Sequence, residues 1–266
     1  MNEETKWKKS HSSALVFIIL VITLPGLLIP VEYRLVAWLL TLLLMTLFTL
    51  IVGKGLCGRW VGVLIDERNF VSLSRFQIVI WTLVVISAIL VAFLSNISRG
   101  ISDPLKIVIP AELWILMGIS VTSSVASPLI KISKMEDSDS SKKKLEEFKV
   151  SLANRGISVD AENDKAKFDN KGVILVRKNL KDAYFIDIFK GEKLTDGGTL
   201  DIAKIQMFYF TIILVIAYGV AIGTMFLSEA SVIASLPSFN SAMLALIGIS
   251  HAGYLSNKAV TGPIKN

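Results

Sequence analysis

The sequence predicts an all-α membrane protein with six transmembrane helices, a tandem direct repeat of two helices, and a small α+β cytoplasmic insert. Three observations lead to this fold class. Hydrophobic residues make up 53% of the 266 residues, and the mean hydropathy is +0.61. Several apolar runs reach the roughly 20 residues that a helix needs to cross a bilayer. One apolar segment, residues 72–88, recurs as residues 201–217.

The N-terminal region, residues 1–53, contains two long apolar runs. Lys8 and Lys9 precede the run at residues 14–29, which resembles a secretory signal at first sight. No small-x-small cleavage site follows, and a second full-length run covers residues 33–52. We therefore expect a retained transmembrane hairpin.

Two pairs of matching segments indicate an internal duplication. Aligned without a gap, residues 72–88 and 201–217 place Gln77 opposite Gln206, an offset of 129. The segments LWILMGIS, ending at Ser120, and MLALIGIS, ending at Ser250, match at an offset of 130. Two pairs at nearly one offset predict a tandem repeat of a two-helix unit.

The two repeats are assigned to residues 54–131 and residues 201–266. Their helices are expected at residues 73–94, 110–128, 202–226 and 242–256, with Ser72 or Ser74 as the cap of the first. With six spans, only three basic residues fall on the outer side: Arg34, Arg99 and Lys106. This asymmetry predicts that both termini are cytoplasmic. The helices beginning at 73 and 202 then run in the same direction, so the repeat is direct.

The cytoplasmic insert is residues 132–200. We expect an amphipathic helix around residues 145–152, strands at 157–159 and 172–177, and a helix at 180–190. Tyr184 and Phe185 of the last helix are expected to pack on the bilayer surface or on a neighbour. The acidic residues at 160–164 lack the glycine and the final carboxylate of a calcium-binding loop, so no cofactor is expected.

A polar layer is expected inside the membrane. Gln77 has two interpretations, a capping box with Ser74 or an interhelical hydrogen bond, and the repeat favours the second, because Ser74 aligns with Ala203. His251 is a candidate for proton relay or pH sensing, against a neutral imidazole held by hydrogen bonds. The layer comprises Gln77, Ser120, Ser124, Ser127, Gln206, Ser250, His251, Tyr254 and Asn257.

Helix packing is expected along two stripes of small residues, which allow close approach of helix backbones. They consist of Gly118, Thr122, Ala126, Gly248, Ala252 and Ser256. The expected partners are the lipid bilayer, other copies of the chain and a cytoplasmic protein, with no role for nucleic acid. One cysteine and two histidines give no basis for a metal site.

Five phrases carry a resemblance to a known group: GVLIDERNFVSLSRFQIVIWT, LWILMGISVTSSVASPLIK, YFIDIFKGEK, DIAKIQMFYFT and LIGISHAGYLSNKAV. They resemble an uncharacterised family of bacterial polytopic inner-membrane proteins, over about residues 53–258. The resemblance implies a bacterial inner membrane and supplies no activity and no site residues.

Two classes of function remain open. No nucleophile elbow, P-loop or dinucleotide motif is present, so an enzyme is not expected. The favoured hypothesis is a non-enzymatic membrane platform or sensor, oligomeric, that presents its insert to a partner. The alternative is an oligomeric ion channel or small transporter that uses the Gln/Ser/His layer.

Overall fold

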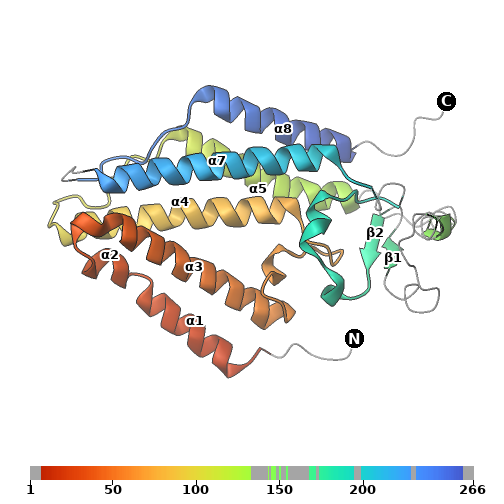
Figure 1. The fold of residues 1–266 in the computed structure, drawn as a ribbon, viewed down its shortest axis with the longest axis horizontal. Coiled ribbons are helices and arrows are strands. Elements are labelled where there is room, and N and C mark those ends of the chain that lie inside the picture. The colour runs from red at the N-terminus through yellow and green to blue at the C-terminus, as the bar shows by residue number, and fades with distance from the viewer. Residues whose placement is uncertain are drawn as a thin grey trace. The chain divides into compact units, whose positions relative to one another are not determined.

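The computed structural model describes residues 7–132, 143, 145–147, 150, 154, 168–171, 174–194, 199–228 and 232–259. It is mostly helical, with little strand (Figure 1). The α-helices are α1 Lys9–Val21, α2 Leu24–Leu28, α3 Arg34–Cys57, α4 Leu73–Ser98, α5 Ala111–Ile132, α7 Ile202–Leu227 and α8 Ser241–Ala259. The 3-10 helices are η1 Val31–Tyr33, η2 Gly62–Leu64, η3 Leu180–Asp182 and η4 Phe185–Phe189, and the strands are β1 Phe168–Lys171 and β2 Ile174–Arg177.

Four helical segments within these residues are long and apolar enough to cross a membrane, which supports a membrane protein. They are Lys9–Leu28, Val31–Cys57, Leu73–Ser98 and Ile202–Leu227. The apolar stretches of α5 and α8 are shorter, Ala111–Thr122 and Ser241–Ser256.

The chain forms two compact units. Unit 1 consists of Met1–Val63, Gln77–Ile119 and Phe210–Leu246, and unit 2 consists of Leu64–Phe76, Ser120–Tyr209 and Ile247–Asn266. Each of α4, α5, α7 and α8 therefore contributes residues to both units.

The first apolar run is interrupted, whereas one continuous helix was expected. α1 ends at Val21, and α2 starts again with Pro25 in its first turn. The proline ring clashes with the carbonyl four residues earlier, which is that of Val21, and this clash favours a break at this point. Both pieces pack along α3 (Figure 1).

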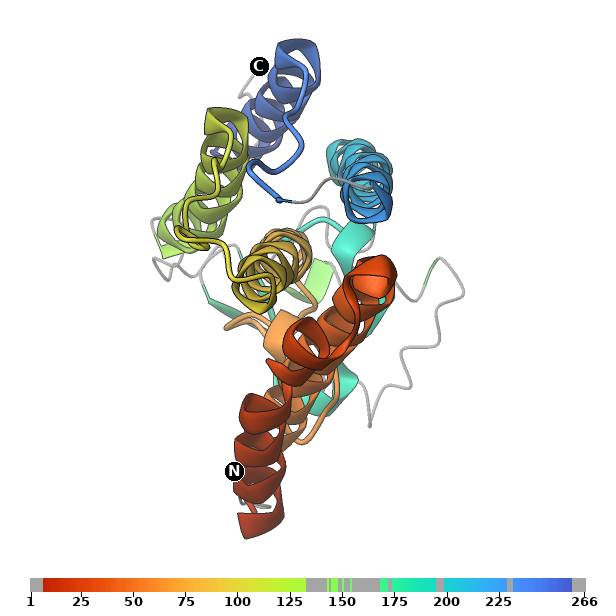
Figure 2. The ribbon, with the colours of Figure 1, turned by 90° about the vertical axis from the view of Figure 1, so that its left-hand side faces the viewer.

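Helix α3 lies next to both α4 and α7 within unit 1 (Figure 2). The Trp38 indole Nε1 donates to the Ser87 hydroxyl of α4 at 2.9 Å, and the Trp38 ring contacts Phe226 of α7 with centroids 6.0 Å apart. The Arg34 Nη2 donates to the Ser228 carbonyl at 2.7 Å. These polar bonds fix α3 at both of its neighbours.

The bounds of the long helices follow the offsets read from the sequence. α4 and α7 both contain 26 residues, and α7 begins and ends 129 positions after α4 begins and ends. α5 and α8 begin at Ala111 and Ser241, which are 130 apart. α4 and α5 also extend beyond the expected ends at Leu94 and Pro128.

Each of α4 and α7 is preceded by a short hairpin with the same hydrogen bonds. In the first, Ser72 N donates to Leu64 O and Asp66 N to Phe70 O; in the second, Asp201 N donates to Phe189 O and Gly191 N to Thr199 O. Isolated bridges join Ile65 to Val71 and Lys190 to Leu200. Before the turn, each residue of the second hairpin lies 125 positions after its counterpart in the first hairpin, and after the turn it lies 129 positions after it. The turn of the second hairpin is therefore four residues longer.

The two hairpins also have a matching hydrogen bond from a side chain of the following helix. Arg75 Nη1 donates to the Ile65 carbonyl at 2.6 Å, and Lys204 Nζ donates to the Lys190 carbonyl at 2.7 Å. Arg75 and Lys204 are 129 apart, and the two acceptors are 125 apart. We define module 1 as residues 62–98 and module 2 as residues 185–227.

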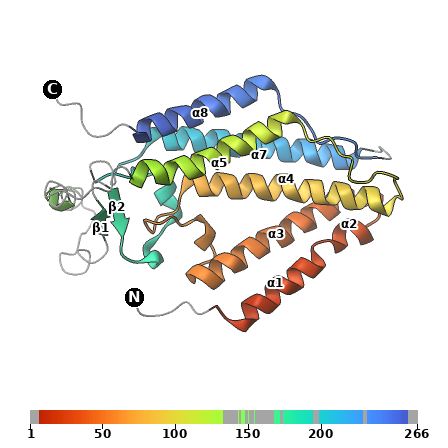
Figure 3. The same ribbon diagram turned by 180° about the vertical axis from the view of Figure 1, so that it is seen from behind.

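The described part of the insert differs from the sequence expectation. β1 and β2 form an antiparallel pair, Phe168 opposite Arg177 (Figure 3), which places a strand within the expected 172–177 segment. The expected helix at 180–190 is wrong: η3 and η4 are separated by extended backbone at Ala183 and Tyr184. The Asp187 carboxylate accepts from Tyr184 N at 2.8 Å and caps η4 there. The expected strand at 157–159 and most of the helix at 145–152 lie outside the described residues.

Candidate functional site

A buried chain of charges joins the two hairpins in unit 2. Arg68 Nε and Nη2 donate to Asp66 Oδ2 at 2.9 and 2.8 Å, and Nη2 lies 3.5 Å from Glu192 Oε1. Lys204 Nζ donates to the same Glu192 oxygen at 3.0 Å. Two cations and two carboxylates therefore alternate, and Glu192 of module 2 connects Arg68 of module 1 with the base of α7.

A second ion pair holds the insert beside this chain. Arg177, the last residue of β2, forms a bidentate pair with Asp187: Nη1 donates to Oδ2, and Nη2 donates to Oδ1 at 3.0 Å. Both guanidinium groups lie over the Phe70 ring, with the Arg68 Cζ 5.0 Å and the Arg177 Cζ 4.2 Å from its centroid. The electron-rich ring stabilises both cations.

Hydrogen bonds to backbone carbonyls connect the turn of the first hairpin to the end of β2. Arg177 N donates to the Arg68 carbonyl at 2.9 Å, and Asn69 Nδ2 donates to the Arg177 carbonyl at 2.6 Å. Asn69 has a φ of +62°, the left-handed conformation that asparagine tolerates better than most residues. The turn of the first hairpin is thereby fixed to β2.

Two apolar clusters enclose the charges. One consists of Ile65, Val71, Leu73, Ala183, Ile188, Met207 and Tyr254, and the other of Phe70, Leu145, Leu175 and Leu194. Both draw residues from module 1 and from the insert. The first cluster joins the first hairpin and the insert to the beginnings of α4 and α7, and the second joins the first hairpin to β2.

The electrostatics favour a fixed, fully charged network. Burial alone would lower the pKa of Arg68, but the Glu192 and Asp66 carboxylates raise it above the value of a free arginine. Breaking one member of a buried pair costs several kcal/mol, because the partner charge stays buried. Asp66 and Glu192 are each bonded to a cation, so the network holds segments of the protein together. Among the described residues, no three His, Cys, Asp or Glu side chains are grouped to hold a metal.

No family model matches the chain, and no curated protein or solved structure is significantly similar to it.

The two glutamines of the expected polar layer lie in different environments. Gln77 is buried, and its Nε2 donates to Thr211 Oγ1 of α7 at 2.7 Å. The bond is interhelical, but its acceptor lies on α7 and not on α5 or α8, which carry the serine, histidine, tyrosine and asparagine residues of the expected layer. Ser74 does not cap with Gln77, since its buried hydroxyl has no hydrogen-bond partner among the described residues. Gln206 is exposed.

The other members of the layer lie on α5 and α8. His251, Tyr254 and Ser120 are buried, and Ser250 is half-buried. The side chains of Ser124, Ser127 and Asn257 lie outside the described part of the structure. The described residues therefore give no continuous polar file.

The stripes of small residues face outward in the described structure. Gly118, Thr122, Ala252 and Ser256 are exposed, and Ala126 and Gly248 are half-buried. A Cβ added at Gly118 or Gly248 would meet no described atom within 4 Å. Close glycine packing occurs instead at the end of α3, where a Cβ at Gly62 would lie 2.6 Å from the Gly53 carbonyl oxygen.

Sequence reasoning missed the charge network. A signal was present: Asp66-Glu67-Arg68 and Gly191-Glu192-Lys193 occupy matching hairpin positions, and Arg75 aligns with Lys204. An ungapped alignment stops before the hairpins because their turns differ in length. Asn96, near the end of α4, was missed as well: its Nδ2 donates to Ile233 O at 3.0 Å and to Pro104 O at 3.3 Å, and its Oδ1 accepts from Ile233 N at 3.1 Å.

Proposed function

We propose that the chain is a non-enzymatic platform or sensor of the bacterial inner membrane, oligomeric, that presents its cytoplasmic insert to a partner protein. The observation that carries this proposal is the set of charges Arg68, Glu192 and Lys204, which fixes both hairpins and the insert to the first turn of α7. The bond from Arg75 to the Ile65 carbonyl holds the first hairpin to α4. An insert held in this way follows movements of the helices. That coupling is what a sensor requires.

Six spans and a direct repeat are part of the proposal. α4 and α7 have the same length and constant offset, and their hairpins have matching hydrogen bonds. Both observations support duplication of the whole module. α5 and α8 contain 22 and 19 residues, close to the roughly 20 that cross a bilayer. The bacterial membrane is inferred from the family resemblance, and the cytoplasmic side of the insert from the basic-residue asymmetry.

The oligomer is proposed on the two outward stripes of small residues. Helix association in lipid depends on close backbone approach, which Gly118 and Gly248 permit. No described residue covers either glycine. A second copy of the chain is the occupant that we propose.

Topology is tested by cysteine labelling of intact cells. In a Cys57→Ala background, single cysteines at positions 98, 235 and 140 are treated with an impermeant maleimide. Labelling is expected at 98 and 235, and at 140 only after the cells are opened. Labelling of position 140 in intact cells would reverse the proposed orientation.

The platform role is tested by site-specific photo-crosslinking in cells. A photo-reactive residue replaces Lys178, which is exposed directly after β2, and a matched probe replaces Arg99 beyond the far end of α4. A discrete protein adduct is expected at 178 only, and Arg68→Met should reduce it because the insert loses its anchor. Steady ion or proton flux from the purified protein in liposomes, together with no adduct at 178, would favour the channel instead.

A further inference from the structure

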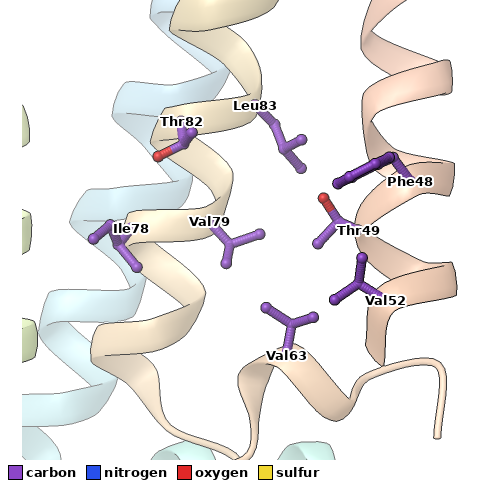
Figure 4. Close-up of a pocket in the computed structure, with 8 residues that line it drawn as sticks. All are labelled: Phe48, Thr49, Val52, Val63, Ile78, Val79, Thr82 and Leu83. Atoms are coloured by element: carbon purple, nitrogen blue, oxygen red, sulfur yellow. The ribbon is translucent and has the colours of Figure 1, made fainter. Parts of the chain in front are cut away.

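Unit 1 contains an apolar pocket between α3 and α4 (Figure 4). Its volume is about 270 Å³, and it is lined by Phe48, Thr49, Val52, Val63, Val79 and Leu83, with Ile78 and Thr82 beside them. The Thr49 hydroxyl donates to the Met45 carbonyl of its own helix at 3.0 Å. Because that hydroxyl is already bonded, the wall formed by α3 presents mainly carbon to a ligand.

The depth of the pocket matches that of lipid chains in one leaflet. The lining residues of α4 begin five residues and end ten residues after Leu73. At 1.5 Å per residue they lie about 7–15 Å along the helix. One leaflet contributes about half of the roughly 30 Å hydrocarbon core.

Module 2 shows that the repeated fold does not require this pocket. The counterparts of Val63 and Val79 are Ile188 and Phe208. Ile188 is fully buried, and Phe208 packs on Phe189 with ring centroids 5.0 Å apart. Larger side chains therefore fill in module 2 the positions that smaller side chains leave open in module 1.

The end of the pocket beside Val63 is basic. Lys54 Nζ donates to the Gly58 carbonyl at 2.9 Å and lies 5.9 Å from the Trp60 ring centroid, so its ammonium is held at this end. Lys54 and Arg59 belong to this end, and a Cβ added at Gly55 would lie 2.6 Å from the Trp7 ring, which brings the neighbouring Lys8 and Lys9 close to it. The described stretches 7–13 and 53–63 contain no carboxylate. Trp60 is exposed, as is usual for tryptophan at headgroup depth.

We propose that this pocket binds one acyl chain of an anionic phospholipid, with its headgroup phosphate beside Lys54 and Arg59. The volume lies just below the usual range for small-molecule pockets, which suits a single chain better than a whole lipid. The basic end selects a negative headgroup. The proposal requires only that α3 and α4 lie in a membrane, and it is independent of the platform role.

The test uses the full-length protein, delipidated in detergent and titrated with phosphatidylglycerol or phosphatidylcholine of identical chains. Native mass spectrometry counts retained lipids. One tightly retained phosphatidylglycerol is expected, bound about tenfold more strongly than phosphatidylcholine. Equal affinity for the two lipids in the wild-type protein would overturn the headgroup assignment.

Variants place the lipid in the pocket. Val79→Phe copies Phe208 of module 2 and should abolish retention, whereas Ile86→Phe, on an exposed position of α4 outside the pocket lining, should retain it. If Val79→Phe does not fold, Val63→Ile is the milder test. This substitution copies Ile188 and should weaken lipid retention several-fold. Lys54→Gln with Arg59→Gln should equalise the two lipids. A folded Val79→Phe protein that keeps its lipid would overturn the proposal.

Discussion

Gln77 in module 1 and Gln206 in module 2 occupy matching positions on two helices of 26 residues each, yet Gln77 is buried and bonded to Thr211 while Gln206 is exposed. The same contrast recurs along the helices. Ser87 of module 1 is buried against Trp38 of α3, whereas its counterpart Ile216 is exposed. Backbone hydrogen bonds are thus maintained in both modules, and side chains differ where the neighbouring elements differ.

The difference indicates which interactions belong to the module and which to its surroundings. The hairpin bonds and the contacts of Arg75 and Lys204 with backbone carbonyls are common to both. The pairing of Arg68 with Glu192 joins one module to the other. Substitutions at matching positions can therefore separate the two kinds of interaction.

The largest effect is expected at Arg68. Arg68→Met leaves the buried carboxylates of Asp66 and Glu192 without this guanidinium, so the free energy of unfolding should fall by about 3–5 kcal/mol. The matched variant is Lys193→Met, which alters the half-buried counterpart and should cost less than about 1 kcal/mol. Thermal and denaturant unfolding in detergent measures both. Equal losses would show that the network does not depend on Arg68.

The next effect is expected at Asn96. Asn96→Leu removes the partners of the Ile233 backbone N–H and C=O, and each buried group left unsatisfied costs about 1–3 kcal/mol. A loss of about 2–4 kcal/mol in unfolding free energy should result. The counterpart Met225→Leu should cost less than about 1.5 kcal/mol, because that exchange nearly conserves volume. A neutral Asn96→Leu would mean that the segment around Ile233 is held to α4 by other contacts.

The glutamines give a smaller and directional contrast. Gln77→Leu should cost about 1–2 kcal/mol, since Thr211 then loses its donor inside the helix pair. Gln206→Leu should change unfolding by less than about 0.5 kcal/mol, as expected for an exposed position. A double-mutant cycle of Gln77→Leu with Thr211→Val should show a coupling of about 0.5–1.5 kcal/mol. Zero coupling would argue against the hydrogen bond.

Much of the fold follows from patterns within single segments. Apolar runs predicted the long helices, and the similar segments 72–88 and 201–217 predicted matching positions for α4 and α7. Pro25 is a local signal for the break before α2, because proline kinks or breaks a helix, but the same residue type at Pro128 does not end α5. The 3-10 segments η3 and η4 could not be predicted this way, since the Asp187 carboxylate that caps η4 is paired with Arg177, ten residues away.

The candidate site depends on contacts between distant residues. Arg68 and Glu192 are 124 residues apart, and no local period or motif connects them. Both are common residue types that usually remain solvated, so only the folded hairpins show that they are buried together. The polar layer was expected from the types of its residues, yet residue type does not indicate that Gln77 faces α7 while Gln206 faces outward.

The smallest effect on the single chain is expected at the outward glycines. Gly118→Leu and Gly248→Leu place side chains where a Cβ meets no described atom within 4 Å, and leucine favours a helix by up to about 1 kcal/mol over glycine. Unfolding should therefore be unchanged or slightly harder. If a second copy packs on these stripes, both variants should shift the oligomer to monomer in native mass spectrometry. The control is Gly62→Ala, whose Cβ would meet the Gly53 carbonyl oxygen at 2.6 Å and must destabilise the chain itself. Unchanged oligomers in both leucine variants would remove the stripes from the assembly and leave lipid as the contact of α5 and α8 there.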